Sequence, residues 1–469
     1  MKRLRGEITV FLTCMIFIFL GFFAVLIEGI RVQNAKASGE RALNLGLSSA
    51  FTKYYSPLWE EYHLFGRAKE GLEEDIKNYL IPEYGLLLKE LEVEEIVWGI
   101  DYEGKIFLHQ VQAYEKYQIV KEAFHKGFSE SFTKAAEEVA GEYSQDAATG
   151  ESVAPPENLE EIEEGREERR KMKGLKELWS RNILEMVLDN PSKVSKKKLS
   201  GGPAVGEGRY SLSSTSPQKN LSQVKQFLRE QVAEQAELLY YQEHFKSYCK
   251  KSISFQKEES LLDYELEYLL EGKGSDRDNL EAWLRRLVLT RTTLNYLVIN
   301  QDNTKRQAAY EMAFVALGFT GLEPLVRAGQ QFILLGWGYE EALIDARVLL
   351  QGGQVSLWKG KQEFSLSFGE IFTFSEAVVR EKAAKRSSIT GLSLGMNYEE
   401  YISLFLGFKK EEKRRMAAWY LIDENIKLRY DKRFSLQDTV FGTHIRVNYM
   451  LPGKLGKDWS LEVERHYSY

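Results

Sequence analysis

The segment 8–27 near the amino terminus contains 20 consecutive uncharged residues (ITVFLTCMIFIFLGFFAVLI). As an α-helix it would extend about 30 Å, the thickness of the hydrocarbon layer of a membrane. A secretory signal peptide has a shorter apolar core, of about 7–15 residues, and a cleavage site that follows it closely. The A-x-A pattern of this chain, Ala35-Lys-Ala37, lies beyond the charges of Glu28 and Arg31. The sequence therefore favours an uncleaved transmembrane helix over a signal peptide.

Basic residues flank this segment on both sides and indicate its orientation. Lys2, Arg3 and Arg5 crowd the residues before it, whereas the basic residues after it are spread from Arg31 to Arg41. Positive charge near a membrane span is retained on the cytoplasmic side. We therefore expect a single-pass protein of the cell membrane with a cytoplasmic amino terminus and its large domain on the outer face.

The helix is expected to continue beyond the membrane, because the sequence from 21 to 49 contains no proline. Small residues recur there at spacings of three and four, which place them on one face of a helix and let another element approach closely. Packing against the protein's own domain and docking onto other single-span proteins both explain this stripe. Glu28, on the same face, is expected to be a solvated interfacial carboxylate or the partner of a cation on another chain. The stripe comprises Gly21, Ala24, Glu28, Ala35, Gly39, Ala42, Gly46 and Ser49.

Beyond the stalk, helical patterns outnumber strand-like ones. Strands are expected at 92–99 and 105–108 and, near the carboxyl terminus, at 435–438, 443–450 and 460–467. These patterns predict a mostly helical α+β protein with small antiparallel sheets. Helices are expected at 71–91 (split at Pro82), at 110–142, after a cap within 276–279, and at 303–317, 321–336, 338–350, 397–405 and 411–428.

Shifts in composition divide the chain into segments. Small polar residues at 144–156 and a Gly, Ser and Lys-rich stretch at 191–220 are typical of linkers, and the charged stretch 160–176 between them is typical of an exposed helix. The predicted order is a cytoplasmic stub (1–7), a transmembrane helix (8–30), a stalk helix with a membrane-proximal α+β region (31–143), linkers flanking a charged helix (144–220), and a helical domain that ends in a β-hairpin region (221–469).

One pattern has the form of a catalytic motif. Gly391-Leu-Ser393-Leu-Gly395 matches the G-x-S-x-G nucleophile elbow, and acid and histidine residues follow it in the order used by α/β-hydrolases (Asp423, Asp438 and His444). That mechanism needs the serine on a sharp turn after a buried parallel strand, whereas charged, helix-like residues precede this motif. A turn before a helix explains the pattern better. We expect no catalytic activity, and an envelope serine hydrolase using Ser393 is the alternative.

Composition argues against other classes of function. The net charge is −6, whereas a protein that binds nucleic acid through its phosphates is expected to carry a basic excess. The six histidines include no pair at a spacing of three or four, and Cys14 and Cys249 cannot form a disulfide framework. The sequence therefore predicts no metal site, no cofactor, no small-molecule substrate and no nucleic-acid partner.

One face of the predicted helix 338–350, extended back to Trp337, carries two acidic residues. Trp337, Glu341 and Asp345 recur at steps of four and so share one helical face. An ordinary amphipathic helix is the favoured interpretation. The alternative is a buried carboxylate paired with Arg347 or Arg327.

Several short motifs near both ends of the chain resemble an uncharacterised family of bacterial single-span membrane proteins. This family accompanies the components of tight-adherence (Tad, or Flp-type) pili and is similar in layout to the pseudopilin-like TadE and TadG proteins. The resemblance implies a structural or assembly role, with the lipid bilayer and single-span pilus subunits as partners, and it supplies no catalytic residues. The motifs are Gly6-Glu-Ile-Thr-Val-Phe11, Ala35-Lys-Ala37, Tyr62-His-Leu-Phe65, Trp337 to Asp345, Gly352-Gly-Gln-Val355, Gly391-Leu-Ser393 and Tyr398-Glu-Glu-Tyr401.

The resemblance also points to a processing site. Pilins are cut after a glycine by a prepilin peptidase, and Gly6 before Glu7 has that form. Type IV-like pilins carry a glutamate five residues past the cut, where this chain has Phe11. Gly6 and Glu7 are therefore a candidate processing site, and the departure at Phe11 argues against cleavage there.

Overall fold

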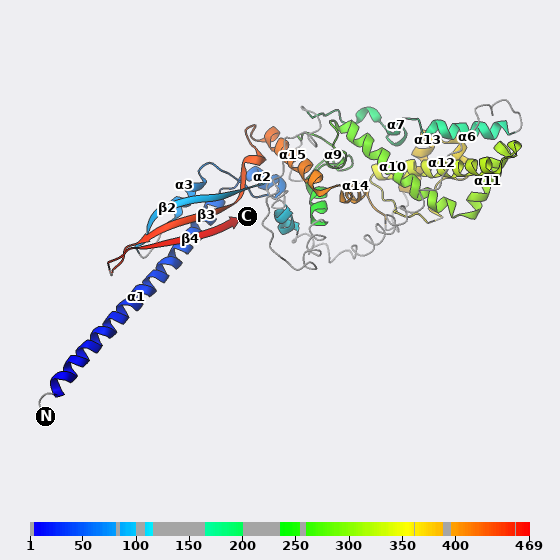
Figure 1. Cartoon of the computed structure of the whole chain (residues 1–469). Helices are drawn as coiled ribbons and strands as arrows, with labels where there is room; N and C mark the ends of the chain where they lie inside the picture. The colour runs from blue at the N-terminus through cyan, green and yellow to red at the C-terminus, as the bar shows by residue number, and fades with distance from the viewer. Residues whose placement is uncertain are drawn as a thin grey trace. The chain divides into compact units, whose positions relative to one another are not determined.

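The computed structural model describes residues 4–80, 85–99, 108–115, 165–199, 235–253, 259–360, 362–387, 395–454 and 456–469. It is mostly helical, with a small antiparallel sheet and a long apolar helix at the amino terminus, which confirms the predicted α+β class (Figure 1). The chain folds as two units. Unit 1 comprises Met1–Ala113, Tyr210–Ser222 and Tyr430–Tyr469, and unit 2 comprises Tyr114–Arg209 and Gln223–Arg429.

Helix α1 (Leu4–Phe51) is continuous for 48 residues. The absence of a proline predicts this continuity, because no residue inside the helix lacks a backbone N–H. Most side chains between Ile8 and Ile27 are exposed, whereas buried positions recur from Glu28 to Phe51. Among the described residues, α1 is the one helix long and apolar enough to cross a membrane. Its apolar half therefore supports the prediction of a membrane anchor.

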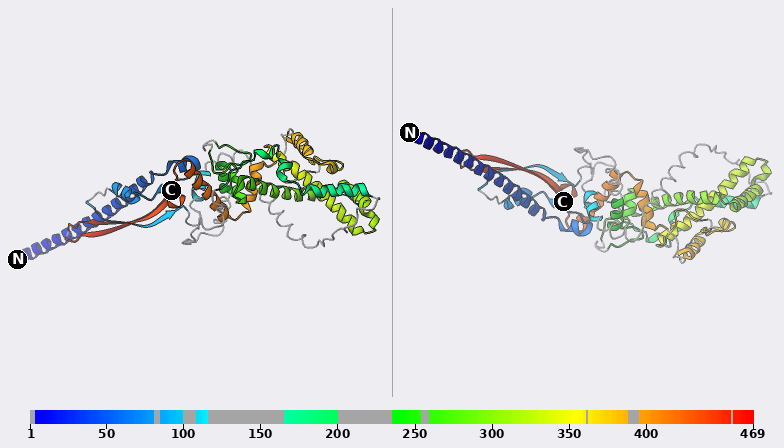
Figure 2. Two further views of the ribbon diagram at one scale, coloured as in Figure 1. Left: turned by 90° about the horizontal axis from the view of Figure 1, so that it is seen from above. Right: turned by 90° about the horizontal axis from the view of Figure 1, so that it is seen from below.

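The sheet of unit 1 is built around β3 (Thr439–Leu451), which pairs antiparallel with β1 (Arg67–Ala68), β2 (Leu87–Trp98) and β4 (Trp459–Ser468). Strands β3 and β4 form the predicted hairpin, in register from Gly442 opposite Ser468 to Leu451 opposite Trp459. The first five residues of β3 are all buried, and from Thr443 onward alternate residues are buried, which gives this part of the sheet one apolar face. Figure 2 shows the hairpin running beside α1 in both views.

Two expectations near residues 71–108 are wrong. Helix α3 ends at Tyr79 (Leu72–Tyr79), and Leu87 and Leu91 lie in β2 instead of continuing the helix. Gly85 has a φ of 75°, which breaks the helical path, and pairing with the distant strand β3 then selects the extended conformation. Leu108 is helical rather than part of a returning strand. Residues 105–107 lie outside the described part of the chain.

The small-residue stripe of α1 packs within unit 1 from Ala35 onward. Ala35 and Ala42 belong to an apolar core that also contains Tyr449 and Val463 of the hairpin. A Cβ atom on Gly39 would lie 3.0 Å from the ring of Tyr449, and one on Gly46 would lie 3.1 Å from the carbonyl oxygen of Ile76. Of the two explanations for the stripe, packing against the protein's own domain therefore holds for this half.

The remaining stripe residues have different surroundings. Ser49 is half-buried near the end of α1. Gly21 is exposed with no atom within 4 Å of a Cβ built on it, and Ala24 is half-buried. Glu28 pairs with Arg31 of its own helix, at 3.0 Å between the carboxylate Oε1 and the guanidinium Nη1. Only the part of the stripe within the apolar half thus remains available to another helix.

The carboxyl end of α1 is fixed by residues far away in sequence. The buried guanidinium of Arg67 donates to the carbonyl oxygen of Ala50 and pairs with Asp75 at 3.0 Å. The hydroxyl of Tyr469, the last residue, donates to the carbonyl oxygen of Phe51 at 2.6 Å. These bonds satisfy carbonyl groups that a helix end leaves unpaired.

Unit 2 is helical throughout its described residues, apart from loops and short 3-10 turns. Helix α12 forms its centre and packs against α10, α11 and α13. Its helices include α6 (Arg166–Leu178), α7 (Ile183–Val187), α9 (Glu265–Glu271), α10 (Asp276–Asn300), α11 (Asn303–Leu317), α12 (Glu323–Leu350), α13 (Glu376–Ser387), α14 (Tyr398–Gly407) and α15 (Glu411–Arg429). Unit 1 contains the further helix α2 (Ser56–Tyr62).

The structure corrects the sequence prediction at α12 and α10. A single helix replaces the two expected at 321–336 and 338–350. Gly338 lies inside α12, where α10 approaches closely: a Cβ there would be 2.9 Å from the carbonyl oxygen of Thr292. The cap of α10 is Ser275, which accepts from the Asp278 N–H, whereas Asp276 accepts from the N–H groups of Asp263 and Tyr264.

Segments expected to be solvated are partly packed. The first residues of the expected linker 191–220 pack within unit 2, where the Ser195 hydroxyl donates to Asp276 at 2.6 Å. The charged helix buries Leu175 and Leu178 at its carboxyl end. The segment 435–438, expected as a strand, contains a 3-10 turn (Leu436–Asp438). The linker 144–156 lies outside the described residues.

We expect Gly39→Leu to destabilise unit 1, because the new side chain must displace the Tyr449 ring from a tightly packed site. Overpacking of this kind costs about 1–3 kcal/mol. Denaturant unfolding of the full chain in detergent, followed by near-UV circular dichroism, would measure it. Gly29→Leu is the matched control, since Gly29 lies on the same helix with no atom within 4 Å of its Cβ position. Equal denaturant midpoints for Gly39→Leu and Gly29→Leu would contradict close packing of Gly39 on Tyr449.

Candidate functional site

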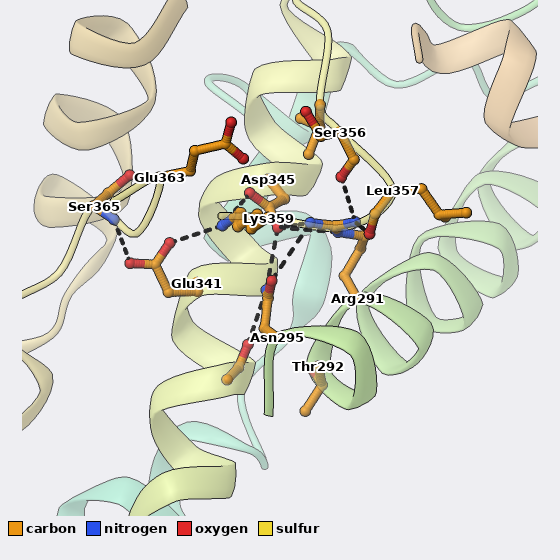
Figure 3. Close-up of polar contacts among 12 residues, drawn as sticks. Arg291, Thr292, Asn295, Glu341, Asp345, Ser356, Leu357, Lys359, Glu363 and Ser365 are labelled. Atoms are coloured by element: carbon orange, nitrogen blue, oxygen red, sulfur yellow. Dashed lines mark hydrogen bonds and ion pairs between the residues drawn. The ribbon is translucent and has the colours of Figure 1, made fainter. Parts of the chain in front are cut away.

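A group of buried charges lies inside unit 2 and forms the candidate site (Figure 3). Arg291 comes from α10, Glu341 and Asp345 from α12, and Lys359 from the loop that follows α12. The side chains of these four residues have no exposed surface. Arg386 of α13 joins them with 17% of its side chain exposed. We call these five residues the ionic cluster.

Asp345 is the centre of the ionic cluster. Its Oδ2 accepts from Nε and Nη2 of Arg291 at 3.0 and 2.9 Å and from Nδ2 of Asn295 at 3.1 Å. Its Oδ1 lies 2.7 Å from Nζ of Lys359 and 2.7 Å from Nη1 of Arg386. Both oxygens are therefore fully occupied by donors. The helical spacing places Arg291 and Asn295 on one face of α10, so that both reach the same carboxylate.

The ionic cluster also holds the loop after α12. Nη1 of Arg291 donates to the carbonyl oxygens of Ser356 and Leu357 at 2.9 and 2.7 Å. Oε1 of Glu341 accepts from the N–H groups of Ser365 and Leu366 at 2.6 and 2.7 Å, as Figure 3 shows for Ser365. Backbone groups buried in a loop need such partners. The charges thus replace the hydrogen bonds that a helix or sheet would supply.

Burial by itself raises the pKa of Asp345, but the neighbouring cations of Lys359, Arg291 and Arg386 outweigh it and hold the pKa well below its ordinary value. The ionic cluster contains three cations and two carboxylates, so its net charge is about +1. A carboxylate with a depressed pKa and saturated oxygens is a poor general base. The geometry therefore indicates a structural role rather than proton transfer.

The sequence predicted part of this arrangement. Glu341 and Asp345 do share a buried face of α12, as the step of four indicates, and the favoured interpretation of an ordinary amphipathic helix missed their charge network. The partners proposed in the alternative are also wrong. Arg327 pairs with the exposed Glu323, and Arg347 pairs with Asp189. The true partner Arg291 lies 54 residues from Asp345, a separation at which sequence spacing carries no signal.

Glu340, beside Glu341 on α12, is a buried acid of a different kind. It is fully buried, and neither of its carboxyl oxygens has a hydrogen-bond partner within the described part of the chain. Burial, together with the negative charge of Glu341, raises the pKa of Glu340 to about 10. By contrast Glu267, whose pKa burial raises to about 7, accepts from the Tyr398 hydroxyl and the Tyr248 N–H. Glu340 is therefore protonated at neutral pH.

The acid and histidine residues proposed for the alternative hydrolase mechanism are divided between the two units. Gly391 to Leu394, which include Ser393, lie outside the described residues. Asp423 pairs with Lys427 of its own helix in unit 2. His444 and Asp438 belong to unit 1, where His444 lies on β3, stacked on His466 at 3.7 Å between ring centroids. The hydrolase hypothesis stays a prediction.

Gly6 and Glu7 lie in the first turns of α1. No group of three or more His, Cys, Asp or Glu side chains is arranged to hold a metal ion in the described ranges. Cys249 is half-buried, and Cys14 is exposed on the apolar half of α1.

The fold thus defines a mostly helical protein with an apolar amino-terminal helix, a small-sheet unit and a helical unit that contains the ionic cluster. The chain belongs to DUF5702, a family of unknown function, which matches residues 161–451. This range includes every residue of the ionic cluster. No curated protein and no solved structure matches the chain.

We expect Asp345→Asn to destabilise the protein strongly, because Arg291 and Lys359 would be left buried without a full counter-charge. Breaking a buried ion pair in this way costs about 3–5 kcal/mol. Thermal unfolding of the full chain in detergent would show it as a lowered midpoint. Glu323→Gln is the matched control on the same helix, since it changes only exposed contacts, the ion pair with Arg327 and the hydrogen bond from the Tyr310 hydroxyl. A midpoint for Asp345→Asn equal to that of the control would exclude a structural role for the ionic cluster.

We expect Glu340→Met to stabilise the protein, because an unpaired buried carboxyl group costs about 1–3 kcal/mol that an apolar side chain of similar size avoids. The folded pKa is raised above the unfolded value, so Glu340 makes the wild type lose stability as pH rises from about 4.5 towards 10. The gain from Glu340→Met should therefore grow with pH over this range. Denaturant midpoints at several pH values would measure it, and a loss of stability at every pH would show that Glu340 has a partner.

Proposed function

We propose that this protein is a structural or assembly component of a Tad-like surface pilus or related envelope system. It is anchored in the cell membrane by the apolar half of α1, with the amino terminus in the cytoplasm and both folded units on the outer face. The observation that carries the proposal is the continuity of α1 from the apolar half into the core of unit 1. The resemblance to pilus-associated single-span proteins supplies the system.

The continuity of α1 has a mechanical consequence. No break separates the exposed apolar residues from those that pack against Tyr449 and Val463, so a force on one half is transmitted to the other. A flexible linker at the membrane surface would leave the folded domain free to rotate. A rigid connection instead fixes its height and orientation, which suits a subunit that is placed among other subunits.

Association with other single-span subunits would use the apolar half of α1. An exposed apolar helix needs lipid or other helices around it. Gly21 and Ala24 lie three residues apart there, and small residues allow close approach between helices in a membrane. Gly39 and Gly46 are unsuitable for this role, because unit 1 already covers them.

The chemistry of the ionic cluster supports a structural function. All oxygens of Asp345 and Glu341 accept from donors of the chain itself, so neither acid is available to a substrate. The alternative function, an envelope serine hydrolase using Ser393, rests on the G-x-S-x-G pattern and on the order of the acid and histidine residues that follow it. Labelling by a fluorophosphonate probe that is lost in Ser393→Ala would favour the hydrolase.

Proteinase treatment of intact cells tests the proposed topology. We expect peptides from residues 60–469 to be released, and Met1 to Ile30 to stay in the membrane. A retained fragment beginning at Glu7 would show pilin-like processing. Protection of both folded units would place them in the cytoplasm and exclude a pilus role.

Replacement of residues 8–27 by a leucine-alanine span of equal length tests the association. We expect the chimera to remain membrane-bound but to lose crosslinks to single-span pilus subunits and to fail to restore pili in a deletion strain. Gly29→Leu is the control, since Gly29 lies outside the replaced segment. Normal pili in the deletion strain itself would contradict the proposed role.

A further inference from the structure

The turn between β3 and β4 lies against α1 where its apolar segment ends. Nη2 of Arg31 donates to the carbonyl oxygen of Pro452, and the N–H of Lys454 donates to Oε1 of Glu28 at 3.4 Å. The indole of Trp459 also interacts with the Glu28 carboxylate. Arg31 is four residues beyond Ile27, about 6 Å along the helix. The sheet thus places residues 452–454 and 456–459, which we call the hairpin tip, close to the end of the apolar segment.

Two glycines determine the backbone conformation of the hairpin tip in its described residues. Gly453 is required there, since a Cβ would lie 1.8 Å from the carbonyl oxygen of Lys457, and its N–H donates to Asp458 at 3.1 Å. Gly456 has a φ of 98°, which other residues rarely adopt. This conformation leaves the side chains of Lys454 and Lys457 exposed. The two lysines and Asp458 give the tip a net charge of about +1.

Apolar side chains are exposed at the same end of the sheet. Trp459 keeps 45% of its surface exposed although its neighbours on the same strand face, Leu461 and Val463, are buried. Leu87 at the start of β2 is 48% exposed and lies opposite Met450 of β3. An indole with an apolar body and a polar N–H favours the boundary between lipid tails and water. Lysines beside it favour the phosphate groups of anionic lipids.

We propose that the hairpin tip is a second membrane contact, in which Trp459 enters the interface of the bilayer and Lys454 and Lys457 bind the phosphate groups of anionic phospholipids. The lipid belongs to the same leaflet from which α1 emerges, because the contacts to Glu28 and Arg31 fix the tip at that height. The inference rests on the membrane anchoring in the proposed function. Its consequence is that unit 1 is held to the bilayer at two points and cannot tilt freely about α1.

Tryptophan quenching in vesicles tests the contact. The full chain is reconstituted in phosphatidylcholine vesicles, with and without phosphatidylglycerol, that contain lipids brominated near the headgroup. We expect the wild type to show a quenched component that Trp459→Phe lacks. Trp179→Phe, which removes an exposed tryptophan of unit 2, is the control and should keep this component. Equal quenching of the wild type and Trp459→Phe would overturn the inference.

A charge variant tests the lipid class. We expect phosphatidylglycerol to increase the quenching of Trp459 fluorescence in the wild type. In the double variant Lys454→Gln, Lys457→Gln, we expect phosphatidylglycerol to have little effect on this quenching. Lys432→Gln, at an exposed lysine elsewhere in unit 1, is the control. An increase that persists in the double variant would overturn the role of these lysines.

Carbonate extraction of the same vesicles separates the two proposals. If the protein resists extraction but shows no quenched fluorescence from Trp459, the anchor is retained and only the hairpin contact is overturned. Release of the protein by carbonate would overturn both the membrane anchor and the hairpin contact that depends on it.

Discussion

The close packing of α1 against the β3–β4 hairpin determines most of what unit 1 can do. This packing requires small residues on α1. A Cβ atom on Gly39 would already lie 3.0 Å from the Tyr449 ring, so a larger side chain would clash with it. Strands β3 and β4, near the carboxyl end of the chain, thereby cover part of α1, near its amino end. Tyr469 donates a hydrogen bond to Phe51 at the end of that helix. Because the same helix continues into the exposed apolar segment, the position of the sheet relative to that segment is fixed.

The fold of unit 2 depends on buried, paired charges, whereas that of unit 1 depends on close packing. The centre of unit 2 contains Arg291, Asp345 and Lys359 without exposed surface, and these groups are tolerable only because each has several partners. They connect α10 and α12 to a loop that has little regular backbone hydrogen bonding of its own. Glu340 is the exception on the same helix, since it is buried with no donor in the described structure and stays neutral.

Local patterns in the sequence predicted the elements that depend on neighbouring residues. The bounds of α11 were predicted without error, and α14 and α15 were predicted to within a few residues, because capping residues and helical periodicity are local signals. The prediction failed where distant pairing decided the outcome. Leu87 and Leu91 fit a helical period, yet β3 draws them into a strand. Two helices were expected at 321–336 and 338–350, whereas α12 is continuous there and packs closely on α10 at Gly338.

The sequence by itself determined that the chain has one apolar helix able to cross a membrane, a continuous stalk and a mostly helical α+β fold. These features follow from composition and periodicity over short windows. Only the tertiary structure decided that the small-residue stripe from Ala35 to Gly46 packs within unit 1, that Asp345 meets Arg291, and that the hairpin tip lies where the apolar segment ends. Each of these contacts joins residues far apart in the chain, and the complementary shapes and charges that select them become visible only after folding brings them together.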